Sequence, residues 1–424
     1  MTQGASGRLW TRRPVLGWAL YDWANSAFAL AVMTAFVPVM LAGYWNDGAP
    51  SNVGTFRLGL ANGAASLLVA LAAPLIGALA DGRGWRKSGL LWITGLGVLA
   101  TAALGSVGAG GWRLAIALYV LASVAFAAAN ALYDSLLVDV APPADYDRVS
   151  AYGYGLGYLG GALLFALTVV MVTRPTTFGL GSANDAMRLS FALVAAWWLA
   201  FSVPLALWVR DGQPGAGGPG ALVSGFRQLV GTLRRVRSQP QLWRFLVAYW
   251  LYIDGVYTII KMAVDYGLAL GLTTRDLILA MLVTNFVAFP AALAFGQLAE
   301  WIGTRAGIYL GLAVYVAATV AAVFIDSAAE FYALAIAIGL VQGGVQSLSR
   351  SFFARLVPPG QTGEYFGFYN MLGKFAAIIG PVLAGVVALV TGSQRLGVLA
   401  LLVLFIAGAW LFSGVREPAA GETP

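Results

Sequence analysis

The side chains best able to do chemistry in this sequence are a few charged groups inside long apolar stretches. Asp22, Asp254, Lys261 and Lys374 each occupy such a stretch. A charged side chain at the centre of a bilayer costs about 2.5–3.5 kcal/mol on insertion scales, so each group must face a partner, an interface or a water-filled path. Their chemistry would be charge pairing, proton binding or recognition of a charged solute.

One apolar stretch carries a polar stripe, in which Asp254, Tyr257, Lys261 and Asp265 follow one another at helical spacing. At 100° per residue these four side chains fall within about an 80° arc of a helix. Lys261 and Asp265 are one turn apart and can pair, which would lower the cost of burying both, either for function or as a structural bridge. Asp254 is two turns from Lys261, so we expect it to have a functional role.

Lys374 lies about 15 Å into its stretch and needs an anionic partner. That partner could be Asp22, Asp254 or the carboxylate of a substrate, although a permanent ion pair between helices is the structural alternative. Asn25, one turn beyond Asp22, and Asn370, one turn before Lys374, extend the two polar patches. For Asp22 the structural alternative is a bracing contact with a neighbouring helix end.

Two amides on another stretch, Gln342 and Gln346, lie one turn apart. They could hydrogen-bond a polar solute, or they could join helices inside the membrane. Arg350 follows them as the stretch approaches its basic end. Asp134 is a weaker candidate, and we expect it to pair with a loop arginine such as Arg148.

The composition excludes several kinds of chemistry. The 424 residues contain no histidine and no cysteine, which rules out imidazole catalysis, thiolate nucleophiles and disulfides. No phosphate-binding loop is present, and the Tyr-Asp pairs at Tyr21 and Tyr133 lack the second half of an intramembrane aspartyl protease site. We therefore expect neither an enzyme nor a bound metal or cofactor, and any proton must ride on a carboxylate.

The chain is 60% hydrophobic and 10% charged, with a mean hydropathy of +0.80, too apolar to coat a soluble globule of this length. Long apolar runs predict an all-α membrane protein with twelve transmembrane helices in two six-helix bundles. The predicted spans are 16–42, 56–80, 88–108, 113–136, 150–172, 189–209, 243–269, 276–299, 305–325, 331–353, 365–391 and 395–415.

These spans divide the chain into an N-terminal bundle (1–210), a linker (211–242) and a C-terminal bundle (243–424). The linker is rich in Gly and Pro and then basic, which predicts an interfacial helix. When residues near the end of a span are counted with the nearer side, 17 of the 25 Lys and Arg residues fall on the side of the termini, 6 fall on the other side, and 2 lie deep inside spans. This asymmetry predicts cytoplasmic termini and explains the net charge of +7 without nucleic acid.

A sequence motif occurs twice, once in each half of the chain. The loop after the second span and the loop after the eighth carry matching glycine, acidic and arginine residues, which we expect to act in gating: Gly77, Asp81, Gly84 and Arg86, and then Gly296, Glu300 and Arg305. The order and spacing of these copies predict a duplicated fold built from parallel repeats.

The first copy, from Gly77 to Lys87, resembles the loop motif of the major facilitator superfamily. Within it, the stretches Tyr21–Phe28 and Gly343–Ser351 resemble the branch named for the autophagy-related vacuolar amino-acid effluxer. The resemblance implies two bundles around a central cavity that open alternately to each side, with substrate held near mid-membrane. It leaves the cargo open.

We consider three hypotheses for the function. Mixed charges favour a secondary transporter of a small polar solute, such as an amino acid or related zwitterion, with or without proton coupling. The alternative is export of amphiphilic or cationic compounds, with Trp18, Trp23 and Trp250 among the aromatic walls. A receptor or scaffold would not require charges at mid-depth. The expected location is a bilayer, as in a bacterial plasma membrane.

Overall fold

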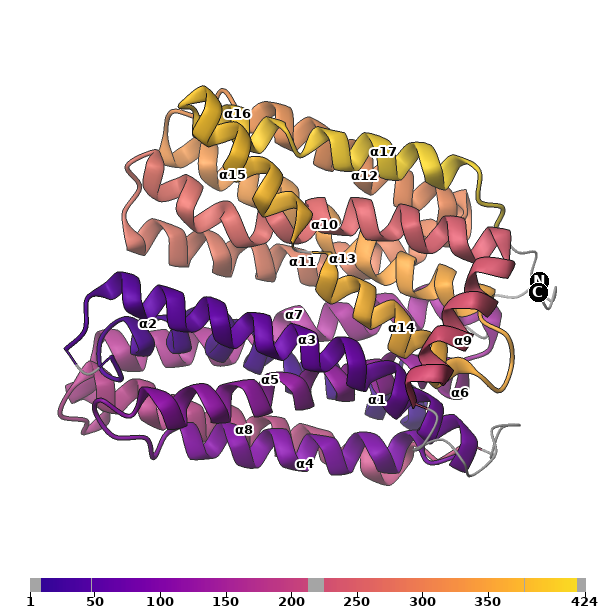
Figure 1. Cartoon of the computed structure of the whole chain (residues 1–424), viewed down its shortest axis with the longest axis horizontal. Coiled ribbons are helices and arrows are strands. Elements are labelled where there is room, and N and C mark those ends of the chain that lie inside the picture. The colour runs from indigo at the N-terminus through magenta and orange to yellow at the C-terminus, as the bar shows by residue number, and fades with distance from the viewer. Residues whose placement is uncertain (1–8, 47, 213–224, 377, 418–424) are drawn as a thin grey trace.

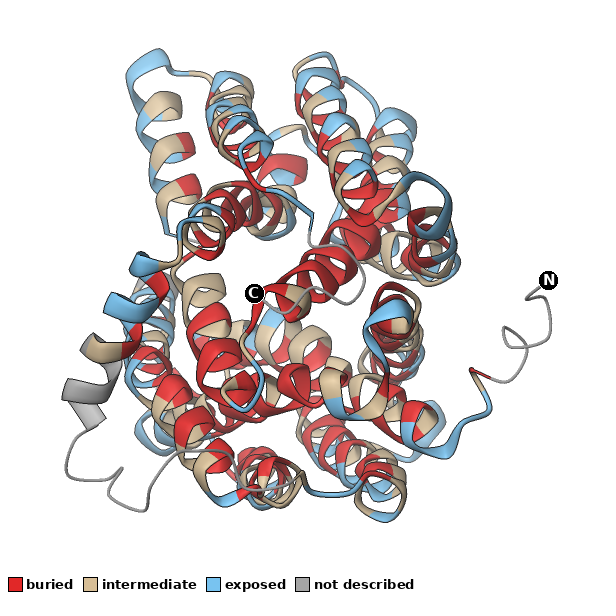
Figure 2. Cartoon of the chain, turned by 90° about the vertical axis from the view of Figure 1, so that its right-hand side faces the viewer, coloured by how far each residue is buried: buried red, intermediate tan, exposed pale blue. Residues whose placement is uncertain are grey.

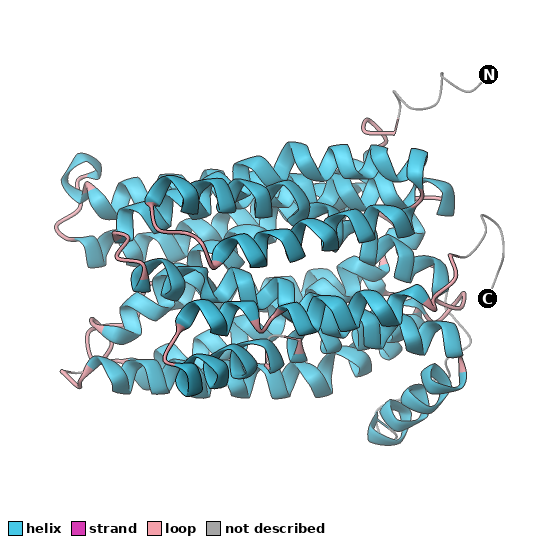
Figure 3. Cartoon of the chain, turned by 90° about the horizontal axis from the view of Figure 1, so that it is seen from above, coloured by secondary structure: helices cyan, strands magenta, loops and turns pink. Residues whose placement is uncertain are grey.

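The computed structural model describes residues 9–46, 48–212, 225–376 and 378–417, apart from the side chains of residues 51, 52 and 225–230. Every regular element among these residues is a helix, and twelve helical segments are long and apolar enough to cross a bilayer. The predicted twelve spans are confirmed. Figure 3 shows the helices running along one common direction, with the loops gathered at the two ends.

The first six spans carry the N-terminal half of the chain. Span one changes from an α-helix to a nine-residue π-helix just after Asp22 and Asn25, and such wide turns are often found at functional sites. The elements are α1 (Arg13–Ala27), η2 (Phe28–Phe36), α2 (Val37–Ala42), α3 (Ser51–Arg83), α4 (Arg86–Leu104), α5 (Trp112–Ser135), α6 (Leu137–Val140), η3 (Pro143–Asp145), α7 (Tyr146–Thr173), η4 (Pro175–Phe178) and α8 (Ala183–Trp208).

The last six spans follow a basic helix of the linker, α9 (Gly225–Ser238). Capping boxes at Thr273 and Ser327 begin two of these spans, because each side chain accepts a hydrogen bond from a backbone N–H of the first turn. The elements are α10 (Pro240–Ala269), α11 (Thr274–Ile302), α12 (Thr304–Ala322), α13 (Ala328–Leu356), α14 (Thr362–Phe375), α15 (Ile379–Thr391), α16 (Gln394–Leu399) and α17 (Leu402–Ser413).

Span eleven consists of two helices, α14 and α15, so the expectation of one continuous helix over 365–391 is wrong. Pro381 is the third residue of α15 and has no backbone N–H, and its ring disfavours a helical residue four positions earlier. The break therefore lies just before this proline, near the middle of the span.

Figure 1 shows the two halves of the chain as two groups of helices, indigo to magenta below and orange to yellow above. Within the first group α1 packs on α7 and α8, and within the second α10 packs on α17. We call the end of the molecule where α1 begins and α17 ends the terminal face. Figure 2, a view onto this face, shows buried residues concentrated inside and between the groups and exposed residues on the outside.

The outer surface is apolar, which suits a chain dissolved in lipid. Trp92, Trp301 and Leu389 are 79%, 81% and 84% exposed, values that would be costly over a whole surface in water. The helices satisfy their own backbone hydrogen bonds, as hydrocarbon requires. Burial inside the fold is therefore left to small and aromatic residues and to a few polar groups.

Two pairs of helices make the most extensive contacts between the groups, α3 with α14 and α7 with α11, and the pairs α7 with α13 and α5 with α14 add to them. Gly77 of α3 and Gly363 of α14 touch backbone to backbone, and a Cβ at Gly77 would overlap the Gly363 carbonyl. Gly296 of α11 also lies close to α7, where an added Cβ would overlap the methyl group of Ala151. Because α3 and α11 end, and α14 and α7 begin, at the terminal face, these approaches close that face.

We predict that Gly77→Ala disfavours the closed terminal face by about 1–3 kcal/mol, as overpacking does elsewhere. A distance measurement between labels on the two groups at this face should show a larger open population. Gly63→Ala is the matched control, because Gly63 lies on the same helix with no atom near the added methyl group. An equal response of both variants would contradict the role of this approach.

Candidate functional site

The most deeply buried arginine in an ion pair between the two groups is Arg350 of α13, which is 1% exposed. Its Nη1 lies 2.9 Å from Asp134 Oδ1 and 3.9 Å from Asp22 Oδ2. Its Nε donates to the Ser150 hydroxyl and its Nη2 to the Ser150 carbonyl, both at 2.9 Å. One guanidinium from the C-terminal half thus joins α1, α5 and α7.

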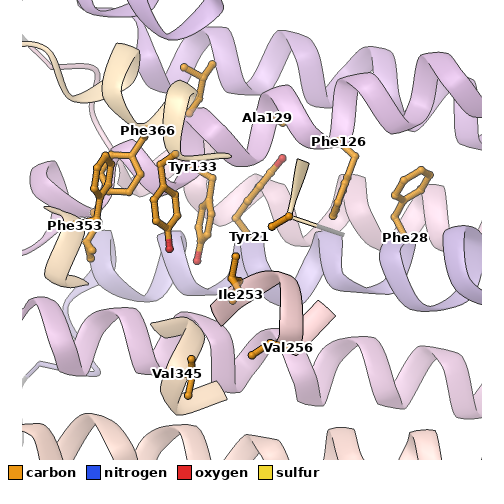
Figure 4. Packing of buried hydrophobic residues seen from close by; sticks show 14 of the residues in the cluster. Tyr21, Phe28, Phe126, Ala129, Tyr133, Ile253, Val256, Val345, Phe353 and Phe366 are labelled. Atoms are coloured by element: carbon orange, nitrogen blue, oxygen red, sulfur yellow. The ribbon is translucent and has the colours of Figure 1, made fainter. Parts of the chain in front are cut away.

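Three aromatic rings surround the same guanidinium. Its carbon lies 4.8 Å from the ring centroid of Trp18, 5.3 Å from that of Tyr133 and 4.3 Å from that of Tyr154. Trp18 and Tyr133 stack on each other at 4.5 Å, and Figure 4 shows Tyr133 beside Tyr21 in the packed interior. We call Trp18, Asp22, Tyr133, Asp134, Ser150 and Tyr154 the Arg350 socket.

Asp134 interacts more closely than Asp22 with the guanidinium of Arg350. Asp134 makes the shorter contact with Arg350 and also accepts a hydrogen bond from the Asn370 amide at 2.8 Å. Asp22 accepts only long hydrogen bonds, 3.3 Å from both Tyr133 and Ser26. Asp134 is therefore the principal counter-ion, and Asp22 adds a second negative charge that no other described cation pairs with.

The sequence predictions of Asp22 and Asn370 as interior groups agree with these positions, but their partners differ from those expected. Asp134 does not pair with Arg148, because it lies deep enough to meet Arg350; Arg148 pairs with Glu300 instead, at 3.3 Å. Asn25 is buried and donates to Asn130 at 2.6 Å, so it joins α1 to α5 in this structure.

The first copy of the loop motif binds the start of α14. Asp81 accepts hydrogen bonds from the backbone N–H groups of Gly363 and Glu364, each at 2.9 Å, and a carboxylate at a helix N-terminus is favourable there. Arg86 lies 3.6 Å from Asp81 and 3.2 Å from Asp139. Gly84 makes the turn between α3 and α4 with φ of 68°.

The second copy binds α7 by different chemistry. Gly296 allows α11 to approach α7, and Glu300 pairs with Arg148. Arg305 donates to the Ser413 carbonyl at 2.6 Å, so it fastens α12 to the end of the last span. The duplicated motif therefore stands at two corresponding junctions between the halves of the chain.

Asp254 is 1% exposed and lies at the break in span eleven. It accepts hydrogen bonds from the backbone N–H groups of Ile379 and Gly380 at 3.1 and 2.9 Å, and from the Thr258 hydroxyl at 3.2 Å. It therefore caps α15, the second half of the broken span. Its role as the cap of α15 accounts for the burial of its side chain.

Lys374 lies in the last turn of α14, just before the same break. Among the described residues no carboxylate forms an ion pair with it, and its ammonium lies 5.6 Å from the ring centroid of Phe126. Lys261 is exposed, repels Lys374 and is attracted by Asp254. The Lys261–Asp265 ion pair that the spacing allows is absent from the described contacts; Asp265 is exposed, and Asp254 attracts Lys261 electrostatically.

The remaining predicted residues form an amide and phenol cluster. Gln346 accepts a short hydrogen bond from Tyr158 of α7, so it joins the two halves. Gln342 is 7% exposed, and its amide oxygen accepts no hydrogen bond from the described residues. Tyr257 is half-buried beside Tyr249. The structure thus places these three side chains inside the fold without showing a ligand.

Sequence reasoning missed Arg350 as the central group, because serines on either side of it suggested the polar end of a span. The predicted span 331–353 put Arg350 only three residues from its end, whereas the helix observed runs to Leu356, six residues beyond Arg350. A charge about 9 Å from a helix end is too deep to be treated as a loop residue.

Two six-span groups, a duplicated loop motif and charges at the junction between the groups define a transporter of the major facilitator class. Comparison with solved structures supports this fold. The human organic anion transporter MFSD10 (TETRAN) matches with a TM-score of 0.70 at 18% identity, over 97% of this chain and all of that one. The proton:xylose symporter XylE matches with a TM-score of 0.71 at 12% identity, over 99% of this chain and 98% of that one.

Sequence comparison is more specific. The family described as "Vacuole effluxer Atg22 like" matches residues 48–142 and 142–421. An uncharacterized MFS-type transporter of Bacillus subtilis, YxiO, is 37% identical over 406 residues, 94% of either chain. Autophagy-related protein 22-1 of Penicillium rubens is 30% identical over 274 residues, which span 57% of this chain and 44% of the fungal protein. The chain therefore belongs to the Atg22-like family of the major facilitator superfamily.

The role of Asp254 as the cap of α15 generates a prediction. Asp254→Ala leaves two N–H groups of α15 without an acceptor, which we expect to lower stability by about 1–3 kcal/mol. Asp254→Asn keeps an acceptor oxygen and should cost less. The midpoint of thermal unfolding measures both, with Asp265→Ala as an exposed control. Equal midpoints for Asp254→Ala and Asp265→Ala would show that the cap does not contribute.

Proposed function

We propose that the protein is a secondary active transporter of amino acids or related small zwitterions, working by alternating access. The observation that carries the proposal is Lys374, a cation at mid-span that lacks a carboxylate partner among the described residues. An ammonium in such a place has a use if a substrate carboxylate reaches it. Lys261, which also lies near the break, adds to the positive field.

Asp254 and Asp22 have different roles in this proposal. Asp254 already accepts three hydrogen bonds at the break, which ties it to α15. Asp22 is held weakly and lies between the two halves of the chain, so it is the better candidate to meet a substrate amine or a proton. Proton coupling would run through a carboxylate, since the chain has no histidine.

We further propose that the terminal face is cytoplasmic and that the membrane is a bacterial plasma membrane. The supporting observations are the excess of Lys and Arg at the terminal face and the near full-length bacterial relative. In this orientation the structure is closed to the cytoplasm. Residues 211–242, which include the basic helix α9, are the proposed linker between the bundles.

Export of amphiphilic cations is a weaker candidate on this structure. It requires extended aromatic walls that are free to receive an apolar body, yet Trp23 stacks on Trp197 at 5.7 Å. These rings are committed to packing within the N-terminal half. A zwitterion needs only the charged groups and amides already described.

The test is uptake and counterflow in proteoliposomes, across a panel of labelled amino acids and with or without a pH gradient. We expect saturable transport by the wild type and a loss of affinity of about 10- to 150-fold in Lys374→Ala, because a hydrogen bond to a charged group contributes about 1.5–3 kcal/mol.

Lys87→Ala is the matched control, because Lys87 is the only lysine outside the spans and bonds a backbone carbonyl at the terminal face. It should transport as the wild type does. If Lys374→Ala also keeps wild-type affinity, Lys374 does not bind substrate. If the wild type transports no amino acid, the zwitterion proposal fails and cationic compounds become the panel to try.

A further inference from the structure

The Arg350 socket is built entirely by the N-terminal half of the chain, whereas its occupant comes from the C-terminal half. Trp18 and Asp22 lie on α1, Tyr133 and Asp134 on α5, and Ser150 and Tyr154 on α7. The occupant touches two carboxylates, a hydroxyl, a carbonyl and three ring faces. Each of these groups recognises an organic cation.

Alternating access must empty this socket. When the terminal face opens, α13 moves away from α1, α5 and α7, and Arg350 leaves with it. Asp22 and Asp134 then remain close enough to repel each other, inside a membrane and without a cation. Two carboxylates held this close repel each other even when the opened face admits water, so the entry of another positive group is favoured as Arg350 withdraws.

We infer that the vacated socket binds the primary ammonium or guanidinium group of the transported solute. The inference rests on the proposed function, and it assigns the amine to this socket rather than to Asp254. The solute and Arg350 would compete for one site, so binding of the solute would hold the terminal face open. Rebinding of Arg350 would close that face and displace the solute from the socket toward the opposite side of the membrane.

The chemistry of the socket favours an organic cation over the other candidates. A divalent metal prefers six or more oxygen ligands, whereas this socket offers two carboxylates among three rings. A proton would neutralise one carboxylate but would gain nothing from the ring faces. A guanidinium or ammonium group uses both the carboxylates and the rings, as Arg350 does.

The socket also lies near the cation proposed for the substrate carboxylate. Asn370 of α14 bonds Asp134 of the socket, and Lys374 is one helical turn further along α14. One turn advances a helix by roughly 6 Å. A small zwitterion with its amine in the socket could therefore direct its carboxylate toward Lys374.

The first experiment removes the natural occupant. In the purified full-length protein, Arg350→Ala should lower the midpoint of thermal unfolding, and low-millimolar methylguanidinium should raise it again by several degrees in a saturable manner. Sodium chloride at equal ionic strength should have no such effect. The wild type, in which the ligand must displace Arg350, should respond much less at the same concentration.

Arg355→Ala is the matched control, because Arg355 also joins the two halves, pairing with Asp147 at 2.7 Å, but has a single ring at 5.9 Å. Methylguanidinium should not rescue it. Adding Asp134→Asn to Arg350→Ala should abolish the response. If Arg350→Ala folds and ignores methylguanidinium, or if Arg355→Ala is rescued equally, the socket is not a selective cation site.

A second experiment needs no change at the socket and covers the case in which Arg350→Ala does not fold. Because the chain has no cysteine, Ala144→Cys and Pro359→Cys give a labelled pair across the terminal face without other changes. Methylguanidinium or methylammonium should increase the population with the longer distance, and Asp134→Asn should reduce this effect. A change of pH alone, with the same labelled pair and no added amine, tests whether a proton replaces Arg350 in the socket.

The outcomes separate this inference from the proposed function. A protein that transports amino acids, but whose labelled pair ignores both amines, keeps its function and loses the socket as the amine site. A shift with pH and none with amines would assign the socket to a proton and overturn the inference. Rescue by methylguanidinium without amino-acid transport would keep the socket and reject the zwitterion.

Discussion

The structure depends on one constraint, which is that a guanidinium inside a membrane must keep its partners. Arg350 is buried between the two halves of the chain and draws every partner described here from the N-terminal half. Removing one member of a buried ion pair elsewhere costs about 3–5 kcal/mol. In the alternating access that we propose, separation of the halves at the terminal face breaks these contacts, so it is favoured when other charges replace them.

The two other junctions at the closed terminal face have a similar arrangement of helices but different polar contacts. At the junction of α3 and α14, a carboxylate meets backbone N–H groups; at the junction of α11 and α7, a carboxylate meets an arginine side chain. Asp81 is nearly buried, whereas Glu300 is 42% exposed, so salt should screen the second junction more than the first. Duplication has kept the positions while the partners diverged.

Much of the fold could be predicted from the sequence, because hydrocarbon allows so few backbone solutions. Apolar runs gave the twelve spans, and the repeated motif located the two junctions. The ion pairs were harder to predict from the sequence, since Arg350 and Asp134 lie on helices that only the tertiary fold brings together, and no local spacing links them. The break before Pro381 was hidden by an apolar sequence that reads as continuous helix, and the Lys261–Asp265 pair that the spacing allows is absent from the described contacts, where Asp254 attracts Lys261.

The break in span eleven divides its two parts between different neighbours. α14 packs against α3 and α5 of the N-terminal half, whereas α15 packs against α10 and α16 of its own half. A single rigid rod attached to both halves would resist their separation along its whole length. Two shorter helices separated by a break allow α14 to tilt while α15, which Asp254 caps, keeps its place. The far side of the C-terminal half can then stay packed while the terminal face moves.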